Sequence, residues 1–173
     1  MFETERLLIS KAKRQDCELL TAIQNSWDDQ ESMTGENGAT VEYFITGLTE
    51  GHIPPSGRKE NYHLLAIRFK TSNEIIGVLE IYEGYPNEKT LWLGQLVINK
   101  NSRCQGFGQE VVAGMKNWSM KNGFDTMKIG VYLKNILALK FWSKNGFDKI
   151  ISISGDLEYG KDKITVITLE SKL

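Results

Sequence analysis

The chain reads LVINKNSRCQGFG over residues 96–108 and NILALKFWSKNGF over residues 135–147. The first segment runs from an apolar strand through a turn with Gly106 and Gly108 into an amphipathic helix. Backbone N–H groups at a helix N-terminus are unpaired and carry a partial positive charge, and glycines let an anion approach them closely. The turn therefore suits a pyrophosphate, with Arg103 adding charge, although a plain glycine turn would have the same sequence.

Two other phosphate-binding patterns fit less well. A dinucleotide-binding fingerprint needs a third glycine or alanine where Val111 stands. No G-x-x-x-x-G-K-[ST] motif occurs in the sequence, which excludes a P-loop.

Hydrophobic periodicity predicts the elements around these segments. Apolar residues at helical spacing predict helices, and short apolar runs bounded by turn residues predict strands. The predicted strands cover 6–10, 63–69, 74–82, 90–98, 126–132, 149–153 and 163–169. The predicted helices cover 16–27, 41–48, 106–121 and 135–144, and 28–40 and 51–61 are predicted loops. This order predicts an α/β (α+β) fold with a mixed sheet and helices on its faces.

Composition narrows the class of protein. The 173 residues are 40% hydrophobic and 25% charged, which is typical of one globular domain. The net charge of −1 leaves no broad basic field, so we expect no nucleic-acid partner. Cys17 and Cys104 lie far apart and His52 and His63 are the only histidines, so no metal site is expected. We find neither a signal-peptide core nor a membrane-length apolar run, and expect a cytoplasmic protein with no membrane partner.

Together, the quoted segments resemble the GNAT superfamily of acyl-CoA-dependent N-acyltransferases. The resemblance rests on Leu96-Val97-Ile98, on the R-x-x-G-x-G turn, and on N-x-x-A-x-x-F-[aromatic]-x-x-x-G-F within residues 135–147. The opening Thr4-Glu5-Arg6-Leu7-Leu8-Ile9 resembles the subgroup that includes ribosomal-protein N-terminal acetyltransferases. The resemblance implies one GNAT domain over residues 1–173, with a mostly antiparallel mixed sheet of about six to seven strands and about four helices.

The resemblance also implies a site for acetyl-CoA. In this family the strand at 91–98 splays from the strand at 126–132, and the pantetheine arm pairs with backbone in the gap. Asn135 would donate to the pantetheine amides, or cap its helix, or do both. The implied cofactor-binding residues are Leu96, Val97, Ile98, Arg103, Cys104, Gln105, Gly106, Phe107, Gly108, Gln109, Asn135, Ala138, Phe141 and Trp142.

The catalytic groups are less clear from sequence. Many relatives carry a tyrosine acid where this chain has Trp142, whose indole N–H is no useful proton source, and Tyr132 is a weak substitute. Backbone N–H around Val97 would stabilise the oxyanion. An amine must lose a proton before it attacks, and the nearest carboxylates are Glu80 and Glu83. Glu80 interrupts an apolar strand, so it is either the base or a charge on a solvated face.

These expectations leave two functions open. The first is an acetyl-CoA-dependent N-acetyltransferase whose acceptor is a small amine or a peptide α-amine, with no metal. The second is a catalytically silent acetyl-CoA-binding module, used for regulation or protein interaction. The resemblance places the acceptor pocket in the loops 28–40 and 51–61 and the helix between them, a region that contains Trp27, Glu31, Glu42, Tyr43 and His52. A homodimer stays open in either case.

Overall fold

The structure is a computed structural model that describes residues 1–27, 38–156, 158, 160 and 163–173. Its strands are β1 (Phe2–Glu3), β2 (Leu7–Lys11), β3 (Tyr62–Phe69), β4 (Ile75–Glu83), β5 (Thr90–Ile98), β6 (Thr126–Tyr132), β7 (Lys149–Gly155) and β8 (Thr165–Lys172). The α-helices among the described residues are α1 (Cys17–Gln24), α3 (Val41–Thr49), α4 (Phe107–Lys121) and α5 (Ile136–Lys144).

The strands form one sheet in the order β1-β2-β3-β4-β5-β6-β8-β7. Only β5 and β6 pair in parallel, and every other neighbouring pair is antiparallel. This confirms the predicted mixed, mostly antiparallel sheet. The count of six to seven strands is wrong by one, because β1 is a two-residue strand with no periodicity of its own and is visible only from its pairing with β2.

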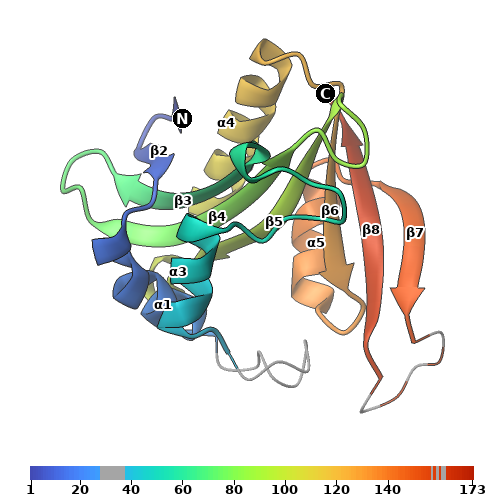
Figure 1. Ribbon diagram of the computed structural model, residues 1–173, viewed down its shortest axis with the longest axis horizontal. Helices are drawn as coiled ribbons and strands as arrows, with labels where there is room; N and C mark the ends of the chain where they lie inside the picture. The colour runs from blue at the N-terminus through green and yellow to red at the C-terminus, as the bar shows by residue number, and fades with distance from the viewer. Residues whose placement is uncertain (28–37, 157, 159, 161–162) are drawn as a thin grey trace.

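Helices cover both faces of the sheet, and the cores on the two faces are separate. Figure 1 shows α1 and α3 over the near face of β3, β4 and β5, with α4 on the other side. The cluster under α1 and α3 includes Leu20, Ile23 and Phe44, whereas Val111 and Met115 of α4 belong to the second cluster. Burying these apolar faces is what holds the layers together.

Local capping sets the ends of the helices. Thr40 Oγ1 accepts a hydrogen bond from the Tyr43 N–H at the start of α3, at 3.2 Å.

The predicted helix at 16–27 ends earlier, at Gln24, and the predicted loop at 28–40 lies mostly outside the described residues. Within the described ranges, no helix is both long and apolar enough to cross a membrane.

Candidate active site

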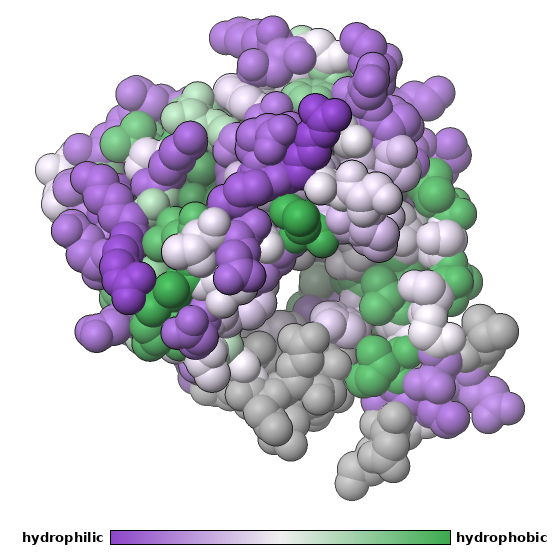
Figure 2. Space-filling model, viewed as in Figure 1, coloured by the Kyte–Doolittle hydropathy of each residue, from purple (hydrophilic) through white to green (hydrophobic). Residues whose placement is uncertain are grey.

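The strands β5 and β6 pair only along their first halves. Their parallel register runs from Thr90 opposite Thr126 to Leu93 opposite Ile129 and then stops. Beyond that point the two strands diverge, as the resemblance implied, and Figure 2 shows the near face hollowed there. A cavity of about 340 Å³ lies in this gap.

The register between β4 and β5 decides which backbone groups face the gap. Asn99 N–H donates to the Ile76 carbonyl on the β4 side at 2.7 Å. Because hydrogen-bonding directions alternate along an antiparallel strand, the Val97 amide also points toward β4, where Val97 pairs with Val78. Within the stretch around Val97, the amides that face the gap are therefore those of its neighbours Leu96 and Ile98.

A β-bulge at Gly94 sets the side-chain directions of β5. Glu80 pairs with Gln95 while Ile81 pairs with Leu93, which leaves Gly94 as the extra residue. Without the bulge, Gln95 would share the face of Leu93, because side chains alternate. With it, the Gln95 amide donates to Glu80 Oε1 at 2.6 Å.

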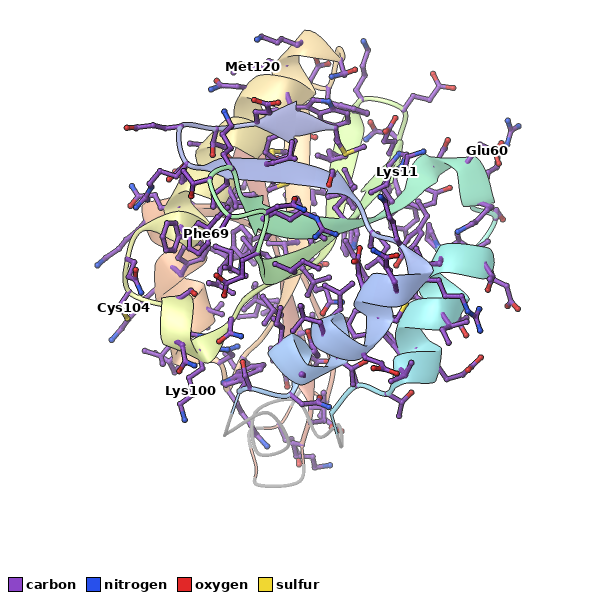
Figure 3. All side chains as sticks on the ribbon, turned by 90° about the vertical axis from the view of Figure 1, so that its left-hand side faces the viewer. Lys11, Glu60, Phe69, Lys100, Cys104 and Met120 are labelled. Atoms are coloured by element: carbon purple, nitrogen blue, oxygen red, sulfur yellow. The ribbon has the colours of Figure 1, made fainter. Side chains whose placement is uncertain are left out.

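The turn before α4 has the backbone conformation of an anion-binding loop. Gly106 has φ 83° at the N-cap of α4, and Cys104 has φ 59°, a left-handed conformation that favours glycine. Figure 3 labels Cys104 and Lys100 on this turn. Arg103 Nε donates to the Ile98 carbonyl at 2.9 Å, which ties the turn to the end of β5.

A cavity of about 550 Å³ runs along this turn. It is lined by every predicted cofactor-binding residue except Gln105, together with Trp27, Ser102 and Leu137. The Gln105 carbonyl instead accepts a hydrogen bond from the Arg6 guanidinium at 3.3 Å. The structure thus brings the two quoted sequence segments to opposite walls of one cavity.

The N-terminal motif anchors the turn from outside. The Glu110 carboxylate, in the first turn of α4, accepts hydrogen bonds from the Arg6 side chain at 2.6 Å and from the Thr4 hydroxyl at 2.5 Å. Burial acts to raise the pKa of Glu110, but the hydrogen bonds from Thr4 and Arg6 outweigh it and lower that pKa. The Arg6 guanidinium also lies 4.2 Å from the centre of the Phe107 ring, a cation–π distance.

The helix α5 supplies the opposite wall. Asn135 Oδ1 accepts a hydrogen bond from the Ala138 N–H at 3.0 Å, so Asn135 is the N-cap. The Trp142 ring is buried between Phe141 and Phe147, with ring centroids 5.0 Å from each. Trp142 is therefore a packed wall, and Tyr132 lines the gap cavity beside it.

A third cavity, of about 460 Å³, opens on the α1 and α3 side of the sheet. It shares Tyr43 and Gly94 with the gap cavity, which in turn shares six residues with the cavity at the turn. Those six are Trp27, Leu96, Val97, Asn135, Ala138 and Trp142. The three cavities therefore adjoin one another at these shared residues, and together they are called the groove below.

Glu80 stands where the third cavity meets the gap. It is only 3% exposed, so its alternative reading as a charge on a solvated face is wrong. Besides the bond from Gln95, Glu80 Oε2 accepts a hydrogen bond from the Tyr43 hydroxyl at 3.3 Å and lies 3.4 Å from His52 Nδ1. A buried carboxylate held by three side chains at a cavity wall is a group that can accept a proton from a bound amine.

The other predicted acidic candidates lie elsewhere. Glu83 is three residues from Glu80 on the same strand and so faces the opposite side. It accepts a hydrogen bond from His63 at 2.7 Å and lines none of the three cavities, which removes it as the alternative base. Glu42 is exposed and also lines none of them, and Glu31 lies outside the described residues.

Sequence reasoning missed Tyr62 and the holding role of Gln95. Tyr62 lines the third cavity from β3, and its hydroxyl lies 3.4 Å from His52 Nδ1. Burial first, and the Glu80 charge second, raise the pKa of Tyr62, so its hydroxyl stays protonated. Gly94, an isolated glycine inside an apolar strand, is the one local signal that could have indicated the bulge beneath Gln95.

Among the described residues, no group of three or more His, Cys, Asp or Glu side chains could hold a metal ion.

Comparison with known proteins identifies the family of this chain. The model of the acetyltransferase (GNAT) family matches residues 20–147, so the chain belongs to this family. An uncharacterised N-acetyltransferase of Bacillus subtilis, YobR, is 27% identical over 81 residues, which is 47% of this chain and 31% of that protein. The matched part thus spans about a third of this curated relative.

Solved structures share the fold at low sequence identity. A spermidine N-acetyltransferase from Vibrio cholerae, in complex with CoA and spermine, has a TM-score of 0.74 at 12% identity, covering 96% of this chain and 95% of that one. The ribosomal-protein-S18-alanine N-acetyltransferase from Escherichia coli has a TM-score of 0.69 at 13% identity, covering 96% and 93%. At these identities the likeness establishes the fold.

Proposed function

We propose that the protein transfers the acetyl group of acetyl-CoA to a primary amine by direct attack. The observation that carries this proposal is the groove of three adjoining cavities, with the glycine turn before α4 at one end and the buried Glu80 carboxylate at the other. Family membership supports the same chemistry.

The residues of the groove suit acetyl-CoA. The N–H groups at the start of α4, with Arg103, would hold the pyrophosphate. The pantetheine arm would lie in the gap between β5 and β6 and bond to the main chain of Leu96 and Ile98, as an added strand does. Asn135 would offer its side-chain NH₂ to a pantetheine carbonyl, since its capping bond uses only the oxygen.

The chemical step needs a base and an oxyanion donor. Glu80 takes a proton from the bound ammonium, directly or through one water, and the amine nitrogen attacks the thioester carbon. The Leu96 N–H, which points into the gap, donates to the oxyanion of the tetrahedral intermediate. The C–S bond then breaks and CoA leaves as the thiolate, while the remaining extra proton on the attacking nitrogen passes to that thiolate or to water, which leaves a neutral amide. Glu80 releases its proton to solvent through His52, whose side chain is 26% exposed.

A thiol-release assay with a panel of amines tests the proposal. The panel spans simple alkylamines, polyamines, aminoglycosides, amino acids and N-terminal peptides, and calorimetry measures acetyl-CoA binding in parallel. Turnover of at least one amine supports an enzyme. Acetyl-CoA binding without turnover of any amine contradicts it and favours the silent binding module.

A further inference from the structure

The wall of the third cavity is aromatic along most of its length. We propose that the amine acceptor is a primary monoamine with an apolar body, bound with its nitrogen at Glu80 and its body against this wall. This inference rests on the proposed acetyltransferase function and names the acceptor of that site. The cavity is lined by Tyr43, His52, Ile53, Pro54, Tyr62, Glu80, Ile81, Tyr82, Tyr85, Trp92 and Gly94.

Charge in the cavity favours a single ammonium. Glu80 is the only acidic side chain among the described residues that line it, so a second ammonium would meet no carboxylate among them. The Lys59 ammonium lies next to the wall, 5.3 Å from the centre of the Tyr62 ring, and would repel a second positive charge. A polyamine would therefore place its second cation against apolar rings, with no carboxylate partner among the described residues of the wall.

Three of the four tyrosine hydroxyls in the wall already have polar partners. The Tyr82 hydroxyl accepts a hydrogen bond from the Arg58 N–H at 2.7 Å. The Tyr62 hydroxyl lies 3.4 Å from His52 Nδ1, and the Tyr43 hydroxyl donates to Glu80. A peptide α-amine brings amide groups close to the reacting nitrogen, and these hydroxyls are already engaged. The wall offers mainly ring carbon, which suits an aliphatic or aromatic body.

The rings support one another in fixed positions. Tyr82 and Tyr85 meet edge to face with centroids 6.4 Å apart, and Tyr85 meets Trp92 in the same way at 5.5 Å. Tyr82 is buried in the core of this face, and Trp92 packs against that core. A wall that is already ordered loses little freedom when an apolar body binds to it. Its volume of about 460 Å³ lies within the range of sites that enclose small molecules.

A matched pair of amines tests the inference. Pentylamine and 1,4-diaminobutane have chains of the same length and differ in a terminal methyl group against a terminal ammonium. We expect kcat/KM for pentylamine to exceed that for the diamine by at least about tenfold, and that for ethylamine by a similar factor or more. A tripeptide with a free α-amine and spermidine should both react more slowly than pentylamine.

A variant with a second carboxylate sharpens the test. Ile53 lines the cavity and is 43% exposed, so Ile53→Glu leaves the core intact. The new carboxylate should lower the preference for pentylamine over the diamine by about two- to fivefold, the range of an exposed ion pair. Ile153→Glu is the matched control, because Ile153 is 55% exposed on β7 and lines none of the three cavities.

The possible results separate this inference from the proposed function. Faster transfer to the diamine, to spermidine or to the tripeptide overturns the apolar monoamine and leaves the acetyltransferase standing. An equal effect of the two glutamate variants on the ratio also overturns it. Binding of acetyl-CoA without transfer to any amine overturns the acetyltransferase, and the acceptor inference with it.

Discussion

Replacing Glu80 with glutamine removes the proposed base and keeps its shape. The Gln95 side chain can still donate to the oxygen that it contacts at 2.6 Å, and the new NH₂ group can donate to the Tyr43 hydroxyl. The substitution replaces hydrogen bonds to a charged group with somewhat weaker bonds to a neutral one. We therefore expect the free energy of unfolding to fall by only about 1 kcal/mol. The fold therefore survives the change, and activity can be compared directly.

The size of the effect depends on pH. With an ordinary alkylammonium pKa of about 10.4, roughly one amine molecule in 2,500 is neutral at pH 7 and about a third are neutral at pH 10. A general base typically contributes about 10²–10⁴-fold. We expect Glu80→Gln to lower kcat/KM by about 10²–10³-fold at pH 7, and by less than about tenfold at pH 10, where the amine needs no base.

The assay is thiol release at saturating acetyl-CoA across pH 6.5–10, with the best amine of the panel. Glu83→Gln is the matched control: it makes the same chemical change on the same strand, on the opposite face and away from the three cavities. If Glu80→Gln keeps its kcat/KM at every pH, or loses the same factor at pH 7 and pH 10, Glu80 is not the base. The contribution of the protein would then be positioning alone.

Three further changes test other parts of the site. Gly108→Glu should abolish acetyl-CoA binding in calorimetry, because a Cβ at this position would already lie 3.3 Å from the Phe141 ring inside the cavity; Ala113→Glu, on the exposed side of the same helix, should bind normally. Trp142→Phe should keep most of the turnover in the thiol-release assay, since Trp142 is a wall; a hundredfold loss with intact acetyl-CoA binding would mean that its indole N–H takes part. The lowered pKa of Glu110 stabilises the fold above the ordinary glutamate pKa, and this stability is lost as pH falls through the lowered value. Urea unfolding of Glu110→Gln should therefore show a loss at pH 7 that shrinks toward pH 3, and a constant loss would contradict the ionic role.

The sequence was sufficient for features that depend on near neighbours in the chain. The turn at 103–108 could be predicted as a strand-to-helix turn that suits an anion because strand, glycines and helix follow one another within a few residues. The family could be identified because two such segments occur at a fixed separation. Glu80 could be proposed as a candidate base because a carboxylate that interrupts an apolar strand is visible in the local sequence.

The tertiary structure decided where the candidate groups point and what they meet. The bulge at Gly94 shifts the face of every later side chain on β5, and it brings Gln95 to Glu80. Strand register likewise decided which amides around Val97 face the gap, since the alternation is known only once the partner strand is placed.

Contacts between distant segments had no local signature. Arg6 and Glu110 are 104 residues apart, and the aromatic cavity collects side chains from α3, the loop after it, β3, β4, the turn after it and β5. Side-chain periodicity reports which face of its own element a residue occupies, and nothing about the element that will cover that face. The sequence by itself therefore determined the fold family and the glycine turn before α4, whereas only the packing of helices and strands on the sheet determined the partners of Glu80 and the shape of the aromatic cavity beside it.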